Sequence, residues 1–274
     1  MATREIEPDT ESEDKPARSS ASPEPREPET FGRKAGGLAR ELLIVVVGAL
    51  IVSSLLRAFV GQMFIIPSGS MENTLMIYDR VVAQKITDFH RGQVVVFADP
   101  GEWLDEPPVE RGVVRRGLEF VGVLPSSKTG YLIKRVIGTA GDTVVCCDDS
   151  DRLTVNGQPL DETSYLYTEV GGEQVAPSEI QFSVIVPAGH IFVMGDHRNA
   201  SADSRCHLAD AFPGEPDGMN AFVPVDDVVG PAIAVVAPLD RFSALRVPDT
   251  FTTVPAPTAP APAEPTIEPA GVHC

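Results

Sequence analysis

A single apolar run does most to constrain how this chain can fold. Residues 42–60 read LLIVVVGALIVSSLLRAFV, in which Arg57 is the only charged side chain. As a helix the run would extend roughly 28 Å, close to the thickness of a bilayer core. It is apolar on all sides, whereas a core helix is apolar on one side. A cleaved signal peptide fits poorly, because the preceding region is long and acidic and no A-x-A site follows. The sequence predicts one transmembrane anchor over residues 37–60.

The charges around this run predict its orientation. Arg33, Lys34 and Arg40 precede it, and basic residues favour the cytoplasmic side of a membrane. We therefore expect a single-pass protein of the plasma membrane, with the N-terminus cytoplasmic and everything after about Val60 outside. The lipid bilayer is then one partner. Nucleic acid is not expected to be another, because the net charge is −17 and nucleic-acid binding needs a basic surface.

Both ends of the chain have compositions typical of disorder. Residues 1–36 begin with an acidic stretch that is poor in large apolar side chains, so we predict a disordered cytoplasmic tail. Residues 247–274 alternate proline with alanine, threonine and glutamate, which predicts an extended, disordered tail. The folded extracytoplasmic domain is thereby expected over residues 61–246.

Short β-branched runs dominate that domain. They are separated by Gly, Pro, Asp and Asn, and they cover residues 81–84, 93–97, 132–137, 143–147, 182–186, 191–194 and 228–236. This pattern predicts a mainly β fold with antiparallel strands. Asn156 and Gly157 suit a type I′ turn, so residues 153–160 are expected to form a hairpin. The less regular stretches at about 99–130 and 148–186 are predicted to be insertions that add a β subdomain to the catalytic core.

Three polar segments carry the candidate chemistry. They are residues 67–71 (PSGSM), 134–142 (KRVIGTAGD) and 194–205 (MGDHRNASADSR). Alone, each is ordinary: a turn, an edge lysine and a charged loop. A serine nucleophile, however, needs an adjacent base, and lysine can serve only when it is neutral. At a pKa of about 10.4 only about one lysine in a few thousand is neutral at pH 7, and burial lowers that pKa. The apolar neighbours of Lys134 could supply such burial.

The residues alone do not choose between Ser68 and Ser70, or between Lys134 and Lys85. In their order along the chain, the three segments resemble the bacterial type I signal peptidases, or leader peptidases, which are Ser-Lys dyad serine proteases. The resemblance covers the apolar run and most of residues 60–236. It implies that Ser70 is the nucleophile and Lys134 the general base.

The resemblance also implies supporting roles for other residues. The Ser68 hydroxyl and the Ser70 backbone N–H would form an oxyanion hole. Ser201 would orient the lysine, and Asp203 and Arg205 would form a structural charged pair. No cofactor and no metal are expected.

The implied substrates are secreted preproteins with small residues at positions −1 and −3 of the signal peptide. The segment before Ser70 and the strand of Lys134 would flank an extended substrate, whose backbone would pair with a strand edge. The side chains predicted to bind the substrate are Phe64, Ile66, Pro67, Met71 and Ile133.

Some features leave alternatives open. His197 stands where the family often has Asn, and Asn199 and Ala200 replace a more polar pair. A Ser-His triad through His197 is one alternative, although the Ser-Lys pattern is complete without it. Self-cleaving repressor relatives share the Ser-Lys chemistry but lack an anchor. A non-catalytic, anchored binding module would tolerate changes at Ser70 and Lys134.

Four cysteines raise the question of a disulfide, which an extracytoplasmic domain permits. If the second and third segments meet at the active site, Cys146 or Cys147 is expected to bridge Cys206. Free buried thiols are the alternative. Cys274, in the predicted tail, is expected to be unpaired.

Overall fold

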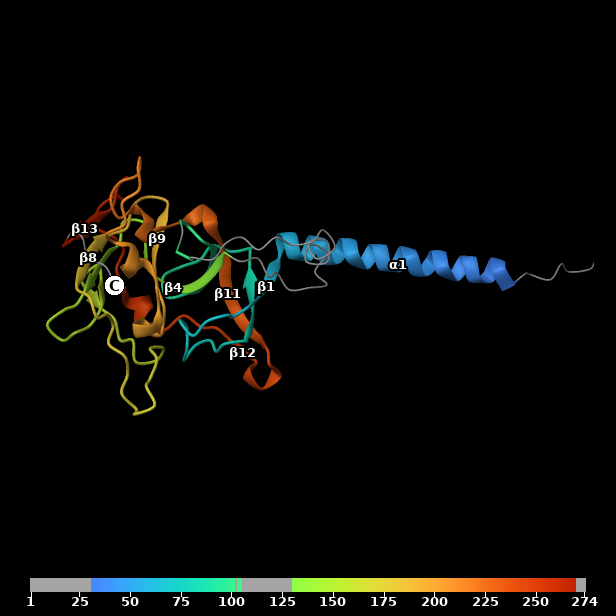
Figure 1. Ribbon diagram of the computed structural model, residues 1–274, viewed down its shortest axis with the longest axis horizontal. Coiled ribbons are helices and arrows are strands. Elements are labelled where there is room, and N and C mark those ends of the chain that lie inside the picture. The colour runs from blue at the N-terminus through green and yellow to red at the C-terminus, as the bar shows by residue number, and fades with distance from the viewer. Residues whose placement is uncertain (1–30, 102, 105–129, 270–274) are drawn as a thin grey trace, which may run out of the picture. The chain divides into compact units, whose positions relative to one another are not determined.

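The computed structural model describes residues 31–101, 103–104 and 130–269 (Figure 1). The predictions for residues 1–30, for most of the first insertion and for Cys274 lie outside these residues. The chain divides into two compact units, residues 1–46 and 47–274. The following paragraphs describe the elements of each unit by themselves.

The N-terminal helix α1 spans Phe31–Phe59. Residues 31–36, predicted to be disordered, are therefore helical. Between Arg40 and Leu55, where side chains are described, the large apolar residues are mostly exposed. Within the part of the chain that the structure describes, no helix is both long and apolar enough to cross a membrane. The anchor stays a prediction.

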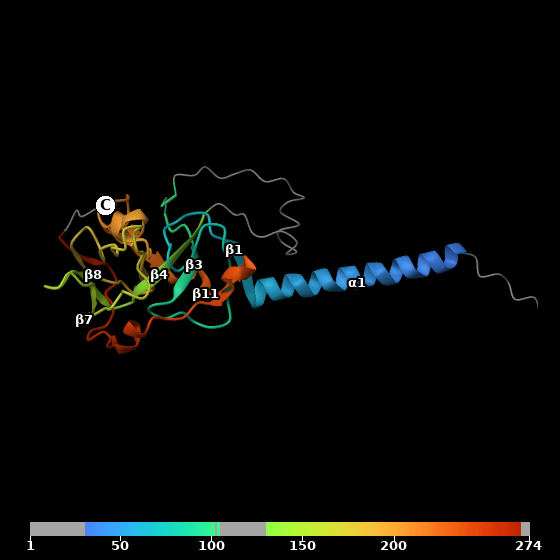
Figure 2. The same ribbon diagram turned by 90° about the horizontal axis from the view of Figure 1, so that it is seen from below.

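The larger sheet has eight strands, and all its pairings are antiparallel. In spatial order they are β1 (Gly61–Ile65), β2 (Arg80–Gln84), β11 (Val228–Ala237), β3 (Val94–Ala98), β4 (Tyr131–Thr139), β9 (His190–Met194) and β10 (Val223–Pro224), with β12 (Ser243–Ala244) paired to β11. Figure 2 shows β11, β3 and β4 side by side. The β-branched runs of the sequence thus form the predicted antiparallel strands.

A second, five-stranded antiparallel sheet follows the order β13 (Thr266–Glu268), β8 (Phe182–Ile185), β5 (Thr143–Cys146), β6 (Thr154–Val155) and β7 (Gln158–Pro159). The hairpin of β6 and β7 turns at Asn156 and Gly157, whose φ angles are 51° and 78°. Positive φ at both central residues is the requirement of a type I′ turn. The predicted hairpin is therefore confirmed.

Single turns of 3₁₀ helix connect the strands in the second half of the chain. They are η1 (Arg198–Ala200), η2 (Ser204–His207), η3 (Met219–Ala221), η4 (Val225–Asp227), η5 (Leu239–Arg241) and η6 (Asp249–Thr253). Two of them, η1 and η2, lie within the third polar segment. This segment follows β9 directly, so the sheet fixes where it begins.

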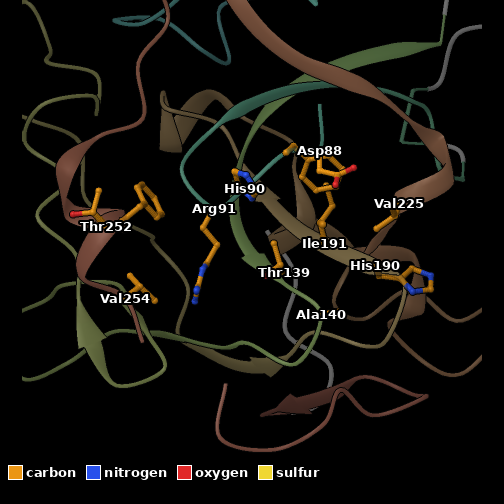
Figure 3. A pocket seen from close by; sticks show the side chains of 12 residues that line it. Asp88, His90, Arg91, Thr139, Ala140, His190, Ile191, Val225, Thr252 and Val254 are labelled. Atoms are coloured by element: carbon orange, nitrogen blue, oxygen red, sulfur yellow. The ribbon is translucent and has the colours of Figure 1, made fainter. Parts of the chain in front are cut away.

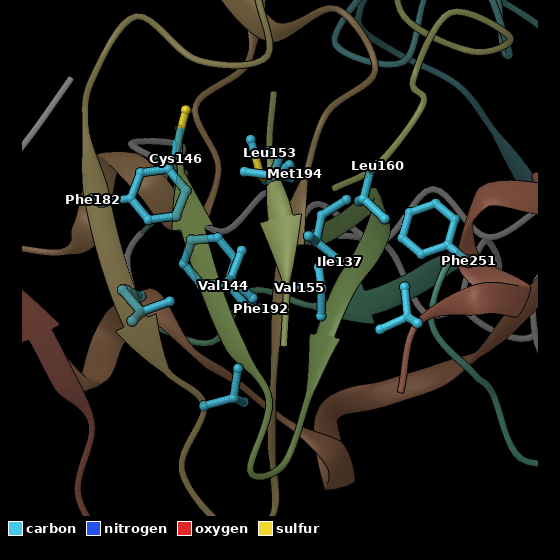
Figure 4. Close-up of a cluster of buried hydrophobic side chains, with 14 of the residues drawn as sticks. Ile137, Val144, Cys146, Leu153, Val155, Leu160, Phe182, Phe192, Met194 and Phe251 are labelled. Carbon is cyan, nitrogen blue, oxygen red and sulfur yellow. The ribbon is translucent and has the colours of Figure 1, made fainter. Parts of the chain in front are cut away.

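Buried side chains form three apolar clusters. Val94 and Val96 of β3 belong to one cluster and Val95 and Phe97 to another, so β3 is buried on both faces. Figure 4 shows part of the third cluster, in which residues of the second sheet pack with Phe192 of β9. Strands covered on both sides read as continuous apolar runs, which explains the VVVF sequence of β3.

The prediction of a disordered C-terminal tail is wrong for residues 247–269. Phe251 and Val254 are buried in the third cluster, and β13 pairs with β8 (Figure 1). Proline lacks an N–H but keeps its carbonyl, and the Pro255 carbonyl accepts hydrogen bonds from Arg91 and Asn156. The composition of this segment does not reveal that its few apolar side chains are buried, or that other parts of the folded domain donate hydrogen bonds to it.

The predicted bridge to Cys206 is also wrong. Cys146 and Cys147 are bonded to each other, at the end of β5 in the second sheet. Cys206 lies in η2, between β9 and β10 of the larger sheet, and is bonded to neither of these cysteines. No described cysteine is a free thiol, which excludes the alternative for these three residues.

Candidate active site

Ser70 and Lys134 meet in the folded domain although 64 residues separate them. Ser70 lies in the turns that follow β1, where the Glu72 N–H donates to the Gly69 carbonyl at 2.9 Å. Lys134 lies on β4, paired with Val95 of β3. Its Nζ is 2.5 Å from the Ser70 Oγ. A nucleophile and a base at hydrogen-bond distance are the arrangement that activates a serine.

The surroundings of Lys134 favour its neutral form. The side chain is only 3% exposed. This burial lowers the pKa of Lys134 from 10.5 to about 8, because desolvation outweighs the opposing attraction of Asp203 and Asp196, while Arg205 lowers it further. At pH 7 about a tenth of such lysines are neutral, several hundred times more than for an exposed lysine. The expectation that apolar neighbours bury this lysine is confirmed.

Asp203 organises the third polar segment. Its Oδ2 accepts hydrogen bonds from the Ser201 Oγ at 2.8 Å and from the Gly195 N–H at 2.9 Å, and its Oδ1 accepts from the Arg205 Nε at 2.8 Å. Burial would raise the pKa of Asp203, but Arg205, the Gly195 N–H and Lys134 hold it below its ordinary value. The described hydrogen bonds include none between Ser201 and Lys134. Ser201 binds the Asp203 carboxylate, which attracts the charge of the lysine.

A second buried ion pair involves the residue that follows Lys134, and neither of its members is among the site residues predicted from the sequence. Arg135 donates from Nε and Nη2 to the two carboxylate oxygens of Asp196, at 2.8 and 2.6 Å. Thr74, four residues after Ser70, also donates to Asp196. The pair therefore ties the strand of Lys134 to the turn of Ser70. One sequence signal was available: Arg135 follows Lys134 inside an apolar strand, and a buried guanidinium needs an acidic partner.

His197 does not complete a triad in this structure. Its backbone N–H donates to the Ser70 carbonyl at 3.1 Å, but its imidazole stacks on Tyr167 and lies near Glu72. Among the described hydrogen bonds, none joins the imidazole to the Ser70 hydroxyl. The geometry gives no support to the Ser-His alternative.

Most of the predicted substrate-binding side chains are buried together. Phe64, Ile66, Met71 and Ile133 all belong to the apolar cluster around β1, β2 and β3. Pro67 and Ser68, by contrast, are exposed. The apolar cluster thus lies directly beneath the turn that carries Ser70.

The larger of the two described cavities lies elsewhere. It has a volume of about 600 Å³ and is lined by residues that include His90, Arg91, His190 and Phe251 (Figure 3). Neither Ser70 nor Lys134 lines it. The other cavity, of about 340 Å³, includes Ser201 and Arg205 in its lining and borders the Asp203 cluster. Cavity size therefore does not mark the dyad.

Comparison with known proteins agrees with this geometry. The family model described as "Signal peptidase, peptidase S26" matches residues 39–237. "Signal peptidase I" of Mycobacterium tuberculosis (strain CDC 1551 / Oshkosh) is 35% identical over 227 residues, covering 76% of this chain and 75% of that protein. "Probable signal peptidase I" of Mycobacterium leprae (strain TN) is 36% identical over 226 residues, covering 74% and 77%.

A solved structure of a signal peptidase I from Enterococcus faecalis V583 covers 53% of this chain and 97% of its own, with 21% identity and a TM-score of 0.28. The assignment rests on the family model and the sequence relatives, and not on this structural likeness. The chain belongs to the peptidase S26 family of signal peptidases, and it is a signal peptidase of type I.

Proposed function

We propose that this chain is a membrane-bound serine endopeptidase that removes signal peptides from secreted preproteins, with Ser70 as nucleophile and Lys134 as general base. One observation carries the proposal: a buried lysine whose Nζ is 2.5 Å from a serine Oγ. The family assignment supports the substrate class, since the relatives carry the name signal peptidase.

The reaction follows from the neutral form of Lys134. The amine takes the proton of the Ser70 hydroxyl while the oxygen attacks the scissile carbonyl. The resulting ammonium gives this proton to the leaving amine, which departs as the new N-terminus of the mature protein. A water molecule, deprotonated by the neutral lysine, then hydrolyses the acyl ester and restores Ser70.

Two donors near Ser70 fit the oxyanion role. Within the described residues, neither the Ser70 backbone N–H nor the Ser68 hydroxyl donates to another group. Both are therefore free to donate to the oxyanion that forms on the substrate carbonyl. In other serine hydrolases the loss of one such donor costs about 10²–10³ in kcat.

The Asp203 cluster supports the dyad without reacting. Arg205 binds both oxygens of the Asp203 carboxylate and Ser201 binds one of them, and Asp203 attracts the charge of Lys134. We propose that Ser201 orients the lysine by fixing this carboxylate. Asp203 and Arg205 then act as a structural charged pair.

Two strand segments are suited to hold an extended substrate. β1 pairs only with β2, and residues 132–134 of β4 pair only with β3. Each segment has an unpaired side among the described residues, to which a substrate strand can add. Phe64, Ile66, Pro67, Met71 and Ile133 would form shallow pockets that admit only the small residues at −1 and −3.

We also propose that residues 42–60 anchor the chain in the plasma membrane, with the N-terminus cytoplasmic and residues 61–246 outside. The apolar sequence of the run supports this proposal, as do the exposed apolar side chains of α1, among them Leu42, Val45, Ile51 and Leu55. Extraction of a membrane fraction with alkaline carbonate tests it. Release of the full-length protein into the supernatant would contradict the anchor.

A cleavage assay tests the catalytic proposal. The full-length protein in detergent is incubated with a preprotein that carries an A-x-A site, alongside Ser70→Ala and Lys134→Ala. We expect both variants to lose cleavage while still unfolding in a cooperative thermal transition. Wild-type cleavage rates in both variants would refute the dyad. They would favour the alternative that the chain is a non-catalytic, anchored binding module.

A further inference from the structure

The imidazole of His197 is 13% exposed and lies between Glu72, in the turn of Ser70, and Tyr167, in the second insertion. We infer that His197 and Glu72 act together as a positioning pair that fixes Ser70 relative to Lys134. The inference rests on the proposed dyad.

On one side, His197 and Glu72 contact the turn that carries Ser70. The backbone N–H of His197 donates to the Ser70 carbonyl at 3.1 Å. The Nδ1 of its imidazole lies 3.2 Å from the Glu72 Oε2. This is an ion-pair distance, but the two groups are not aligned as a hydrogen bond. The Glu72 carboxyl folds back over Gly69, where an added Cβ would come within 3.0 Å of it. The two residues thus hold Ser70 from both sides of the turn.

On the other side, the imidazole rests on a fixed aromatic ring. Its centroid lies 3.8 Å from that of Tyr167, with an angle of 25° between the planes. Tyr167 is itself held by its backbone, whose N–H donates to the Asp196 carbonyl and whose carbonyl accepts from Val175. The ring therefore limits the movement of His197. An Asn side chain has no ring to stack there and is too short to keep both contacts.

The neighbouring residues connect this arrangement to the base. Asp196 binds Arg135, which follows Lys134 on β4. Gly195 approaches so closely that an added Cβ would lie 2.5 Å from the Ser70 carbonyl oxygen. Three consecutive residues of one loop thus contact Ser70 and the residue that follows Lys134. Because a misplacement of about 1 Å can cost about 10²-fold in rate, the contacts of His197 bear on kcat although its imidazole does not touch the reacting atoms.

The test measures kcat and KM for preprotein cleavage by the full-length protein in detergent. The variants are His197→Asn, Glu72→Gln and the double variant. His190→Asn is the matched control, since the only described hydrogen bond of the His190 imidazole is with the Ala188 carbonyl. We expect kcat to fall about 10-fold in each single variant, at unchanged KM and melting temperature. The double variant should be no slower than the singles, because residues that act as a pair are not additive. The control should match the wild type.

Other outcomes would overturn the inference. A kcat within twofold of wild type in His197→Asn would refute it, as would losses that multiply to about 100-fold in the double variant, since the two residues would then act independently. If His197→Asn does not fold, the kcat values of Glu72→Gln and Tyr167→Ala test the inference instead, because both variants keep His197. Ser70→Ala and Lys134→Ala are measured in parallel. If both are inactive and His197→Asn has the wild-type kcat, only the positioning pair is refuted. If both have the wild-type activity, the dyad is refuted.

Discussion

The buried base has a thermodynamic cost that can be measured. The pKa of Lys134 falls from 10.5 to about 8 on folding, with desolvation as the main cause. Each unit of pKa corresponds to about 1.4 kcal/mol. Keeping the buried lysine charged at pH 7 therefore lowers the free energy of unfolding by about 3 kcal/mol. Because the unfolded chain binds more protons between pH 8 and 10.5, stability should rise with pH in that window.

Replacement by Met removes the charge and keeps most of the volume. We therefore expect Lys134→Met to be inactive, yet more stable than the wild type by up to about 3 kcal/mol at pH 7. At pH 9.5 part of the cost is already relieved in the wild type. The advantage of the variant should then shrink by about 2 kcal/mol.

Urea unfolding at pH 7 and pH 9.5 checks this prediction. Trp103 is the only tryptophan; it is 8% exposed and stacks on His207, so its fluorescence reports the loss of the fold. Lys85→Met is the control, because Lys85 is exposed and surface substitutions usually stay within about 0.5 kcal/mol. A stability difference between Lys134→Met and wild type that is negative, or equal at both pH values, would refute the reasoning.

Three further predictions concern activity and the two sheets. With Lys134 as base, kcat/KM should rise about tenfold per pH unit and level off above the pKa of about 8; a maximum below pH 6 in the pH–rate profile would point to a carboxylate or a histidine. Phe251→Ala should lower the free energy of unfolding in urea by about 3–5 kcal/mol, because the ring is buried in the third cluster. It should also make the C-terminal segment sensitive to limited proteolysis. A protease-resistant variant of wild-type stability would contradict the packing of that segment. Gly157→Ala should cost about 1 kcal/mol in thermal unfolding, because its φ of 78° is unfavourable for residues with a Cβ, and an unchanged melting temperature would argue against the type I′ turn.

Local features of the fold were predictable because their causes are local. The β-branched runs predicted β2, β3, β4, β9 and β11 of the larger sheet within a few residues, but not β1, β10 or β12. Asn156 with Gly157 predicted the turn between β6 and β7. The burial of Lys134 was predictable as well, because its neighbours along the strand are apolar. The C-terminal segment was not, because its order depends on Phe251 and on donors such as Arg91 and Asn156 from distant parts of the chain.

The sequence by itself determined which segments carry the chemistry and which family they resemble, because motifs and strand patterns are written in neighbouring residues. Only the tertiary structure decided which side chains meet. It brought Ser70 to Lys134 across 64 residues and Asp196 to Arg135 across 61, paired Cys146 with Cys147, and set His197 between Glu72 and Tyr167. Such contacts depend on the order of strands in the sheet, and the spacing of residues along the chain does not encode that order.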